Sequence, residues 1–514
     1  MKMCEEGVGY GELQLVSPYE VQTIHDLKLI QTVNEHARLF LTGIIPEDKK
    51  ASCIALASSA DQIELNQVKD GQLVRPLFKG LVTEIAIRMV RDIYYVEIEA
   101  ISHTFHLDIQ RASRSFQNKR MTYTELIEQV LATYPGSDSI DSASRSTQLG
   151  NFVLQYKETD WQFLKRMASH FGTVLVAEAV ADAPKVWFGV PEGQVGELPA
   201  HTYTLAKDLS TYRNTAHNDT ARPLVENEVL TYGIQSKQRL HLGDRVHLKG
   251  EELVVATAIV RMKQGILTYD YLLTAEAGIR QARMYAPTLT GTSVEGTVLD
   301  VTKEGVRLHL AIDAEQKKEE ATWFPLAPLY TAEGHSGLYC PPELGDTVHL
   351  TFLNRREEEA VVRHSLRKEG ATNPKTADPG ITYWGTPYGK EMKLDRQEVS
   401  VTAKEGTLFL KLHEEDGIEL HSQQPLVLKA EQDLHFTGKQ RLIMTAEESI
   451  HFTCDASSLV LDGSTDIQGE LVEMDGSTKA PVSVSSVEEE DEIDELQLGL
   501  DVAGMMPLAG GADG

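Results

Sequence analysis

The sequence has little cysteine, and its four cysteines lie far apart. Only 4 of the 514 residues are Cys, and no two of them form a C-x-x-C pair: Cys4, Cys53, Cys340 and Cys454. In a chain of this length, such spacing argues against a disulfide framework and against a structural zinc site. We therefore expect the protein to fold in a reducing compartment and to need no metal or other cofactor.

Long apolar runs are also missing. No segment approaches the roughly 18 apolar residues of a membrane span, and acidic Glu5 and Glu6 stand where a signal peptide needs an apolar run. We expect synthesis in the cytoplasm without a signal peptide, so that action outside the cell would need a route other than general secretion.

Basic charge is scarce. Lys and Arg total 49 against 77 Asp and Glu, which gives a formal net charge of -28. Nucleic-acid binders and peripheral membrane proteins normally carry a basic face, so both classes are disfavoured. The segment 485–514 holds nine acids and no Lys or Arg. We interpret it as an acidic, Gly-rich tail that is either flexible or a docking point for a tip protein or effector.

Residues 1–285 are predicted to form a mixed α and β segment. Strand-like runs rich in Val, Ile and Tyr occur at 80–87 and 94–101. Thr122 and Glu125 have the spacing of a capping box, followed by an apolar stripe at helical spacing. A second helix is predicted to start near Thr159 and to end at Gly172.

Residues 292–370 change to short alternating strands separated by turn residues, which predicts a five-stranded OB-type barrel. This segment has nine Lys and Arg against fourteen Asp and Glu, so single-strand nucleic-acid binding is disfavoured and a structural adaptor is favoured. Residues 371–391 are predicted to be a Pro- and Gly-containing linker or neck. It is too short for a catalytic domain. No G-x-S-x-G, P-loop or H-E-x-x-H motif occurs, and no isolated acidic pair stands in an apolar setting. We therefore expect no enzymatic activity.

A fixed period from residue 418 onward decides the interpretation. Apolar i, i+2 pairs recur at steps of eight residues, then nine at the fifth step: Ile418/Leu420, Leu426/Leu428, Leu434/Phe436, Leu442/Met444, Ile450/Phe452 and Leu459/Leu461. Such a pair is a short strand with both side chains on one face. A return to that face every eight residues indicates a β-solenoid. An eight-residue coil is too small to close a core alone, whereas three intertwined chains can form a triangular prism. We predict a trimeric β-helix needle over 392–484, with these twelve residues as its core.

Two pairs of histidines invite a metal-site interpretation. His435 and His451 occupy outward positions sixteen residues apart, and His103 and His106 are three residues apart. His435 and His451 should point away from the trimer axis, where a shared metal would have to lie. His103 and His106 have no Cys or carboxylate ligand within their motif. We expect both pairs to be ordinary polar side chains.

In this order the segments resemble VgrG, the spike of the type VI secretion system, and the fused hub and spike of phage tails, tailocins and extracellular injection particles. The resemblance covers roughly residues 8–484. The matching motifs are Phe78-Lys-Gly80, Arg114-Ser-Phe-Gln117, Met121-Thr-Tyr123, Gln155-Tyr156, Trp161-Gln-Phe-Leu164, Trp323-Phe-Pro325, Gly345-Asp346 and Thr386-Pro-Tyr-Gly389.

The resemblance implies a mainly β fold with some α: a hub of β-barrels and helices, an OB barrel and a trimeric triangular β-helix. It implies a homotrimer that docks on a sixfold, Hcp-like tail tube within the baseplate, punctures the target envelope when the sheath contracts, and carries a PAAR-type tip protein or effectors. Two alternatives stay open. The chain acts chiefly as an effector carrier through 485–514, or it is a β-solenoid adhesin or envelope hydrolase.

Overall fold

The fold is described from a computed structural model. It describes residues 8–198, 202–210, 212–213, 225–303, 305–327, 338–366, 375, 377–454, 457–461, 463, 465–468 and 471. The predicted acidic tail 485–514 lies outside these residues. The chain divides into two compact units, Met1–Thr372 and Asn373–Gly514, which are considered separately. Among the described residues, no helix is long and apolar enough to cross a membrane.

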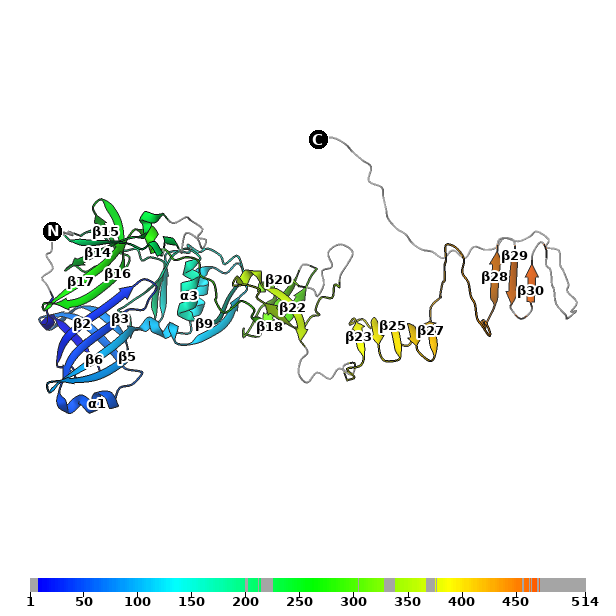
Figure 1. Ribbon diagram of the computed structural model, residues 1–514, viewed down its shortest axis with the longest axis horizontal. Helices are drawn as coiled ribbons and strands as arrows, with labels where there is room; N and C mark the ends of the chain where they lie inside the picture. The colour runs from blue at the N-terminus through cyan, green and yellow to red at the C-terminus, as the bar shows by residue number, and fades with distance from the viewer. Residues whose placement is uncertain are drawn as a thin grey trace, which may run out of the picture. The chain divides into compact units, whose positions relative to one another are not determined.

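A large antiparallel sheet dominates the first unit (Figure 1). Its main path runs through β1 (Leu13–Val16), β4 (Gln62–Lys69), β5 (Gln72–Val90), β6 (Ile93–Ser102), β3 (Arg38–Ile45), β2 (Thr23–Thr32), β16 (Glu251–Lys263), β17 (Ile266–Thr274), β14 (Leu230–Ser236) and β13 (Tyr203–Lys207). In addition, β15 (Arg245–Leu248) pairs with β16 and with β12 (Val195–Glu197). The β2–β16 pair joins two lobes of this sheet, one made of β1 to β6 and the other of β12 to β17, and one apolar core runs through both lobes.

Short helices decorate this sheet. The α-helix α1 (Lys50–Ala55) contacts β5. Among the described residues, the 3-10 helices are η1 (Tyr10–Glu12), η2 (Glu47–Lys49), η3 (His103–Asp108), η4 (Glu226–Val229) and η5 (Glu276–Ile279), and, within the OB segment, η6 (Lys318–Glu320) and η7 (Glu357–Glu359).

Between the lobes and the OB barrel, two amphipathic helices build a second core. Both start at capping boxes: α2 (Tyr123–Leu131) at Thr122, where the sequence predicts one, and α3 (Asp160–Ser169) at Thr159, where the sequence predicts only a helix start. Their apolar faces pack with two small sheets into one buried cluster. The sheets are β7 (Arg111–Phe116) with β9 (Val153–Thr159), and β10 (Leu175–Ala177), β11 (Lys185–Phe188) and β8 (Asp138–Asp141).

The OB barrel follows. Its strand order is β20 (Trp323–Phe324), β19 (Val306–Leu310), β18 (Ser293–Val301), β21 (Thr347–Thr351) and β22 (Val361–Leu366). A parallel bridge between Leu326 and Val362 brings the two edges together, as in a five-stranded OB fold. Its apolar core extends to Phe152, which directly precedes β9, and to Leu154 within β9. Side chains of the helical layer therefore pack into the core of the barrel.

The second unit holds two antiparallel sheets. The first contains β23 (Thr382–Gly385), β24 (Glu391–Leu394), β25 (Glu398–Lys404), β26 (Leu408–His413) and β27 (Gly417–Ser422) in sequence order. The second contains β28 (Ile450–Cys454), β29 (Ser457–Leu461) and β30 (Thr465–Gln468). The first sheet runs through part of the segment 371–391 that the sequence predicts as a linker. The reason is that Thr382 to Gly385 pair directly with β24, across a turn closed by Gly389 at positive φ.

Candidate assembly interface

One face of the sheet β23–β27 is mostly apolar, with Thr382 of the edge strand β23 as a polar member. Directly opposed residues on neighbouring strands share a face, and the register forms two parallel apolar rows. One row is Trp384, Met392, Val401, Leu410 and Leu420, and the other is Leu394, Val399, Leu412 and Ile418.

The opposite face of the same sheet is polar. A cross-strand row there consists of Tyr383, Lys393, Ser400, Lys411 and Glu419. On this face the carboxylate of Glu398 bridges two strands, with Nζ of Lys393 at 3.0 Å and Nζ of Lys411 at 3.1 Å. The sheet is therefore amphipathic, with one face suited to water and the other suited to burial.

The apolar face is accessible to solvent in the single chain. Trp384 is 65% exposed, Val401 46%, Leu420 50% and Ile418 77%. A contiguous apolar patch of this kind is rare on a soluble monomer and usually marks an association surface.

The predicted needle-core residues fall into three groups. Ile418 and Leu420 lie on β27, opposite Leu412 and Leu410 of β26. The middle six lie in described residues without regular strands, and all are exposed: Leu426, Leu428, Leu434, Phe436, Leu442 and Met444. The structure of one chain thus does not bring the middle six together.

The last four core residues meet on one face of the sheet β28–β30. Ile450 is opposite Leu461, Phe452 is opposite Leu459, and Leu459 is in turn opposite Ile467 of β30. Phe452 is 44% exposed, so this face too is available for burial. The twelve predicted residues therefore lie on two apolar sheet faces and an extended connection.

The four histidines contact at most one polar neighbour each or stack on one another, and His103 is buried. His435 Nε2 is 3.7 Å from the carboxylate of Asp433, and His451 Nε2 is 2.8 Å from the hydroxyl of Ser449. The rings of His103 and His106 stack with centroids 5.9 Å apart. No group of three His, Cys, Asp or Glu side chains that could hold a metal occurs within the described ranges.

A buried ionic cluster ties the OB barrel to the helical layer. Arg166 of α3 has 2% of its side chain exposed and lies between Glu158 at the end of β9 and Glu357 of η7. Its Nη1 donates to both Glu357 oxygens at 3.1 and 2.9 Å, and Nε donates to Glu158 Oε1 at 3.0 Å. Nη2 donates to Glu158 Oε2 at 2.9 Å and to the carbonyl of Leu154 at 2.6 Å.

The electrostatics of this cluster are unusual because one guanidinium serves two carboxylates. Burial is the main cause that raises the pKa of Glu357; Glu158 and Glu358 add to it, and Arg166 opposes it. The pKa of Arg166 itself is raised by Glu357 and Glu158 against the cost of burial. The cluster joins residues 191 positions apart, and no local motif in the sequence signals it.

Two further contacts join the same parts. The backbone N–H and the hydroxyl of Ser115 on β7 donate to Asp313, at 2.7 and 2.5 Å. The amide of buried Gln117 donates to the carbonyl of Leu308 and accepts from the N–H of Thr322, both at 3.1 Å. Gln117 belongs to the Arg114-Ser-Phe-Gln117 motif, so the sequence singled out the segment but not its role as a domain joint.

One hydroxyl–imidazole–carboxylate set in the hub is closed to substrate. His36 Nδ1 is 2.8 Å from the hydroxyl of Thr104, and its Nε2 is 3.6 Å from Asp108. Thr104 is fully buried, and the His36 ring packs on Trp161 with centroids 4.2 Å apart. Burial lowers the pKa of His36 to about 4, so the ring is neutral at pH 7. The cluster packs the junction between η3 and α3.

Comparison with known proteins places this geometry in context. Residues 57–247 match the phage tail baseplate hub (GPD) family. The solved structures that resemble the chain include the Francisella PdpA–VgrG complex in its half-lidded form, with 9% identity and a TM-score of 0.51, over 80% of this chain and 87% of that chain. The lidless PdpA–VgrG complex has 10% identity and a TM-score of 0.50, over 77% and 93% of the two chains.

The fold is VgrG-like. A component of the Escherichia coli type VI secretion system with structural similarity to the T4 tail proteins gp27 and gp5 is also similar, with 14% identity and a TM-score of 0.47, over 69% of this chain and 100% of that chain. A search of curated proteins finds no significant match. Residues 57–247 are thus similar to phage tail baseplate hubs, and the chain shares the fold of the VgrG structures.

Proposed function

We propose that three copies of this chain form a non-enzymatic hub and spike that adapts a sixfold tail tube to a threefold needle. The observation that carries the proposal is the one-sided apolar face of β23–β27, with the repeat of apolar pairs that continues it. Three such faces turned toward a common axis bury the rows that each chain alone leaves in water. The polar row through Ser400 then forms the outer surface.

In this arrangement the hub lobes dock on an Hcp-like tube and on baseplate proteins, and the needle is driven through the target envelope. A tip protein of PAAR type or an effector binds beyond the needle. The burial of Thr104 beside His36 fits a mechanical role better than a hydrolytic one. Incubation of the purified protein with peptidoglycan and with polysaccharide tests this point, because release of fragments would favour an envelope hydrolase instead.

The decisive experiment compares two substitutions that add the same charge to opposite faces of β25. Val401→Asp places a carboxylate on the apolar row, and Ser400→Asp places one on the polar row of the opposite face. In a trimer, Val401→Asp buries three like charges around the axis at a cost of several kcal/mol each, about 3–5 kcal/mol by analogy with unpaired buried charges.

We expect the wild type and Ser400→Asp to sediment with the mass of three chains of 57.0 kDa each, and Val401→Asp to sediment as a monomer. A stable wild-type monomer contradicts the trimer. Normal trimers of Val401→Asp contradict the inward orientation of this face. Deletion of 485–514, followed by assays of particle assembly and cargo delivery, separates a carrier role of the tail from the needle role.

A further inference from the structure

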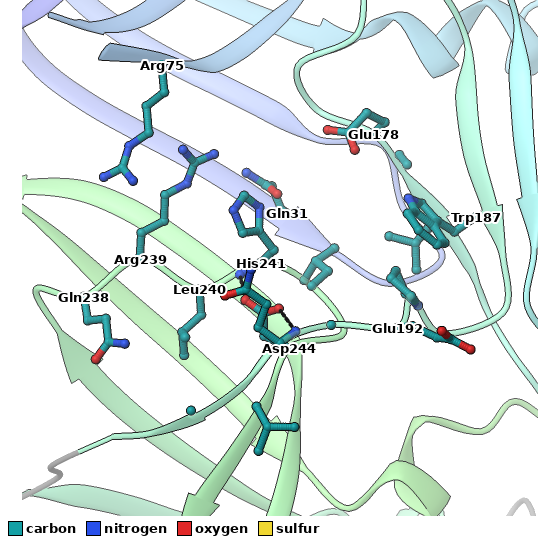
Figure 2. Close-up of a pocket in the computed structure, with 18 residues that line it drawn as sticks. Gln31, Arg75, Glu178, Trp187, Glu192, Gln238, Arg239, Leu240, His241 and Asp244 are labelled. Carbon is teal, nitrogen blue, oxygen red and sulfur yellow. Dashed lines mark hydrogen bonds between the residues drawn. The ribbon is translucent and has the colours of Figure 1, made fainter. Parts of the chain in front are cut away.

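A cavity of about 560 Å³ lies in the hub, where both lobes and the small sheet β8–β10–β11 meet. Its walls come from β2, the start of β5, the β10–β11 pair, the loop at 190–196 and the segment 238–244. Figure 2 shows the side chains of Arg75, Arg239 and His241 on one side of this cavity, with Glu178 and Trp187 on the wall across from them.

The two arginines bring like charges together in a partly desolvated place. Burial is the first cause that lowers the pKa of Arg239, and the charge of Arg75 is the second. Within the described part of the chain, the guanidinium of Arg239 forms neither a hydrogen bond nor an ion pair. Arg75 donates through Nε to Gln67 at 2.7 Å. A guanidinium has five donors in a planar fork, so Arg239 retains its full capacity to bind an oxyanion.

Three carboxylates line the cavity, those of Glu178, Glu192 and Asp244, and none of them is hydrogen-bonded or ion-paired to Arg239 among the described residues. Asp244 accepts from the N–H groups of Gln194 at 2.9 Å and of His241 at 2.7 Å. Glu178 accepts from the N–H groups of the next two residues, at 2.9 and 3.2 Å. Glu178 attracts the charge of Arg239 without bonding to it, so the guanidinium donors of Arg239 are left for a group that the chain itself does not supply.

The segment that carries Arg239 is held in place by a buried tyrosine. The hydroxyl of Tyr271 accepts from the N–H of Leu240 at 2.7 Å and donates to the carbonyl of Gln238 at 3.0 Å. Tyr271 is 1% exposed, so both peptide neighbours of Arg239 are fixed to the core. Fixing the backbone on both sides of an arginine costs conformational entropy, and such fixing is typical of a preorganised binding site.

We propose that this cavity is an oxyanion site in which Arg239 and Arg75 together hold one carboxylate or phosphate group. Bidentate pairing with such a group is the interaction for which guanidinium groups are best suited. The chain as a whole carries a net charge of -28, which disfavours a long polyanion and favours a small, singly presented group. The group comes either from free phosphate or from an acidic side chain of a docked partner. The inference does not rest on the proposed needle.

The test measures binding to the full-length protein by calorimetry with three probes. These are inorganic phosphate, a blocked Glu-Gly-Glu peptide and its Gln-Gly-Gln counterpart, in a buffer without other multivalent anions. We expect phosphate or the acidic peptide to bind and the amide peptide not to bind. Preference for phosphate identifies a free anion as the ligand, and preference for the acidic peptide identifies a docked protein.

Substitutions then locate the binding. Arg239→Gln and Arg75→Gln are each expected to weaken binding at least tenfold, and Arg239→Lys is expected to retain part of it. Arg88→Gln is the matched control, because Arg88 lies on the same strand as Arg75 but pairs with Glu97 outside the cavity. Without anion, Arg239→Gln should melt no lower than the wild type, since it relieves the repulsion with Arg75. Absence of wild-type binding at 10 mM probe, on the order of the weakest useful affinity, overturns the proposal, and so does binding that survives both Gln substitutions.

Discussion

Arg166 is the residue whose replacement should most weaken the joint between the OB barrel and the helical layer. Replacement by Met keeps an unbranched apolar stem, although a shorter one, and removes every donor. The carboxylates of Glu158 and Glu357 would then face each other in a site where each has less than 10% of its side chain exposed. Removal of one partner from a buried ionic cluster costs about 3–5 kcal/mol, because the charge left behind has lost both its water and its partner.

This cost converts into a measurable shift of the melting temperature. The unit Met1–Thr372 has an unfolding entropy of about 0.8 kcal/mol/K on the usual scale per residue. A loss of about 3–5 kcal/mol therefore lowers its Tm by roughly 4–6 °C. Differential scanning calorimetry measures it, with Arg88→Met as the control, since Arg88 forms an exposed pair with Glu97 that contributes less than about 1 kcal/mol. A Tm shift for Arg166→Met no larger than that of the control would refute the assignment of this cluster as the joint.

The same cluster has a pH signature. Because burial raises the pKa of Glu357 above its ordinary 4.5, the folded state binds a proton before the unfolded state does. The stability that this proton contributes is complete below pH 4.5 and is lost as the pH rises through the folded-state pKa. Glu357→Gln cannot take up the proton. The Tm of the wild type minus the Tm of the variant should therefore be larger at pH 4.5 than at pH 8. A difference that is constant over this range contradicts the raised pKa.

Two further predictions concern the hub. Burial lowers the pKa of His36 from 6.5 to about 4, so the neutral ring contributes stability that is lost as the pH falls from 6.5 to 4. The free energy of unfolding of His36→Gln should therefore fall by about 3 kcal/mol less than that of the wild type over this pH range. Urea titrations at several pH values measure this difference. Gly80→Ala should lower the free energy of unfolding by about 3 kcal/mol, because the added Cβ would stand 2.1 Å from the carbonyl oxygen of Ile101. The control Gly11→Ala should change the Tm by less than about 1 °C, because its Cβ would have nothing within 4 Å. Equal melting of the two Gly variants, or identical acid profiles of His36→Gln and wild type, would contradict these assignments.

Local chemistry explains which elements could be predicted from the sequence. The capping boxes at Thr122 and Thr159 mark the starts of α2 and α3, because Ser or Thr followed three residues later by Glu or Gln satisfies the first N–H groups of a helix. The alternating runs at 306–310 and 348–352 coincide with β19 and lie within one residue of β21, because period-two patterning follows from the pleat of a strand.

Features made by distant parts of the chain could not be predicted in this way. The Arg166 cluster depends on a contact across 191 residues, and the Arg239 cavity draws on five separate segments. Both are set by the topology of the large sheet, which a single sequence does not encode in any local pattern. The apolar rows before residue 418 were missed for another reason. The strands β23 to β26 recur at intervals of seven to ten residues, so a search for steps of eight begins only at β27.

The two units differ in how much of their apolar surface a single chain buries. In the first, the sheet lobes, the helical layer and the OB barrel close on themselves, and residues such as Leu39, Phe163 and Phe352 are fully buried within one chain. In the second, the strands are paired but each sheet is a single layer, and Val401 and Ile418 have no second layer among the described residues. An open two-sided sheet of this kind gains little from folding alone. The stability of the second unit should therefore depend on the concentration of chains, as it does in obligate oligomers, whereas that of the first should not.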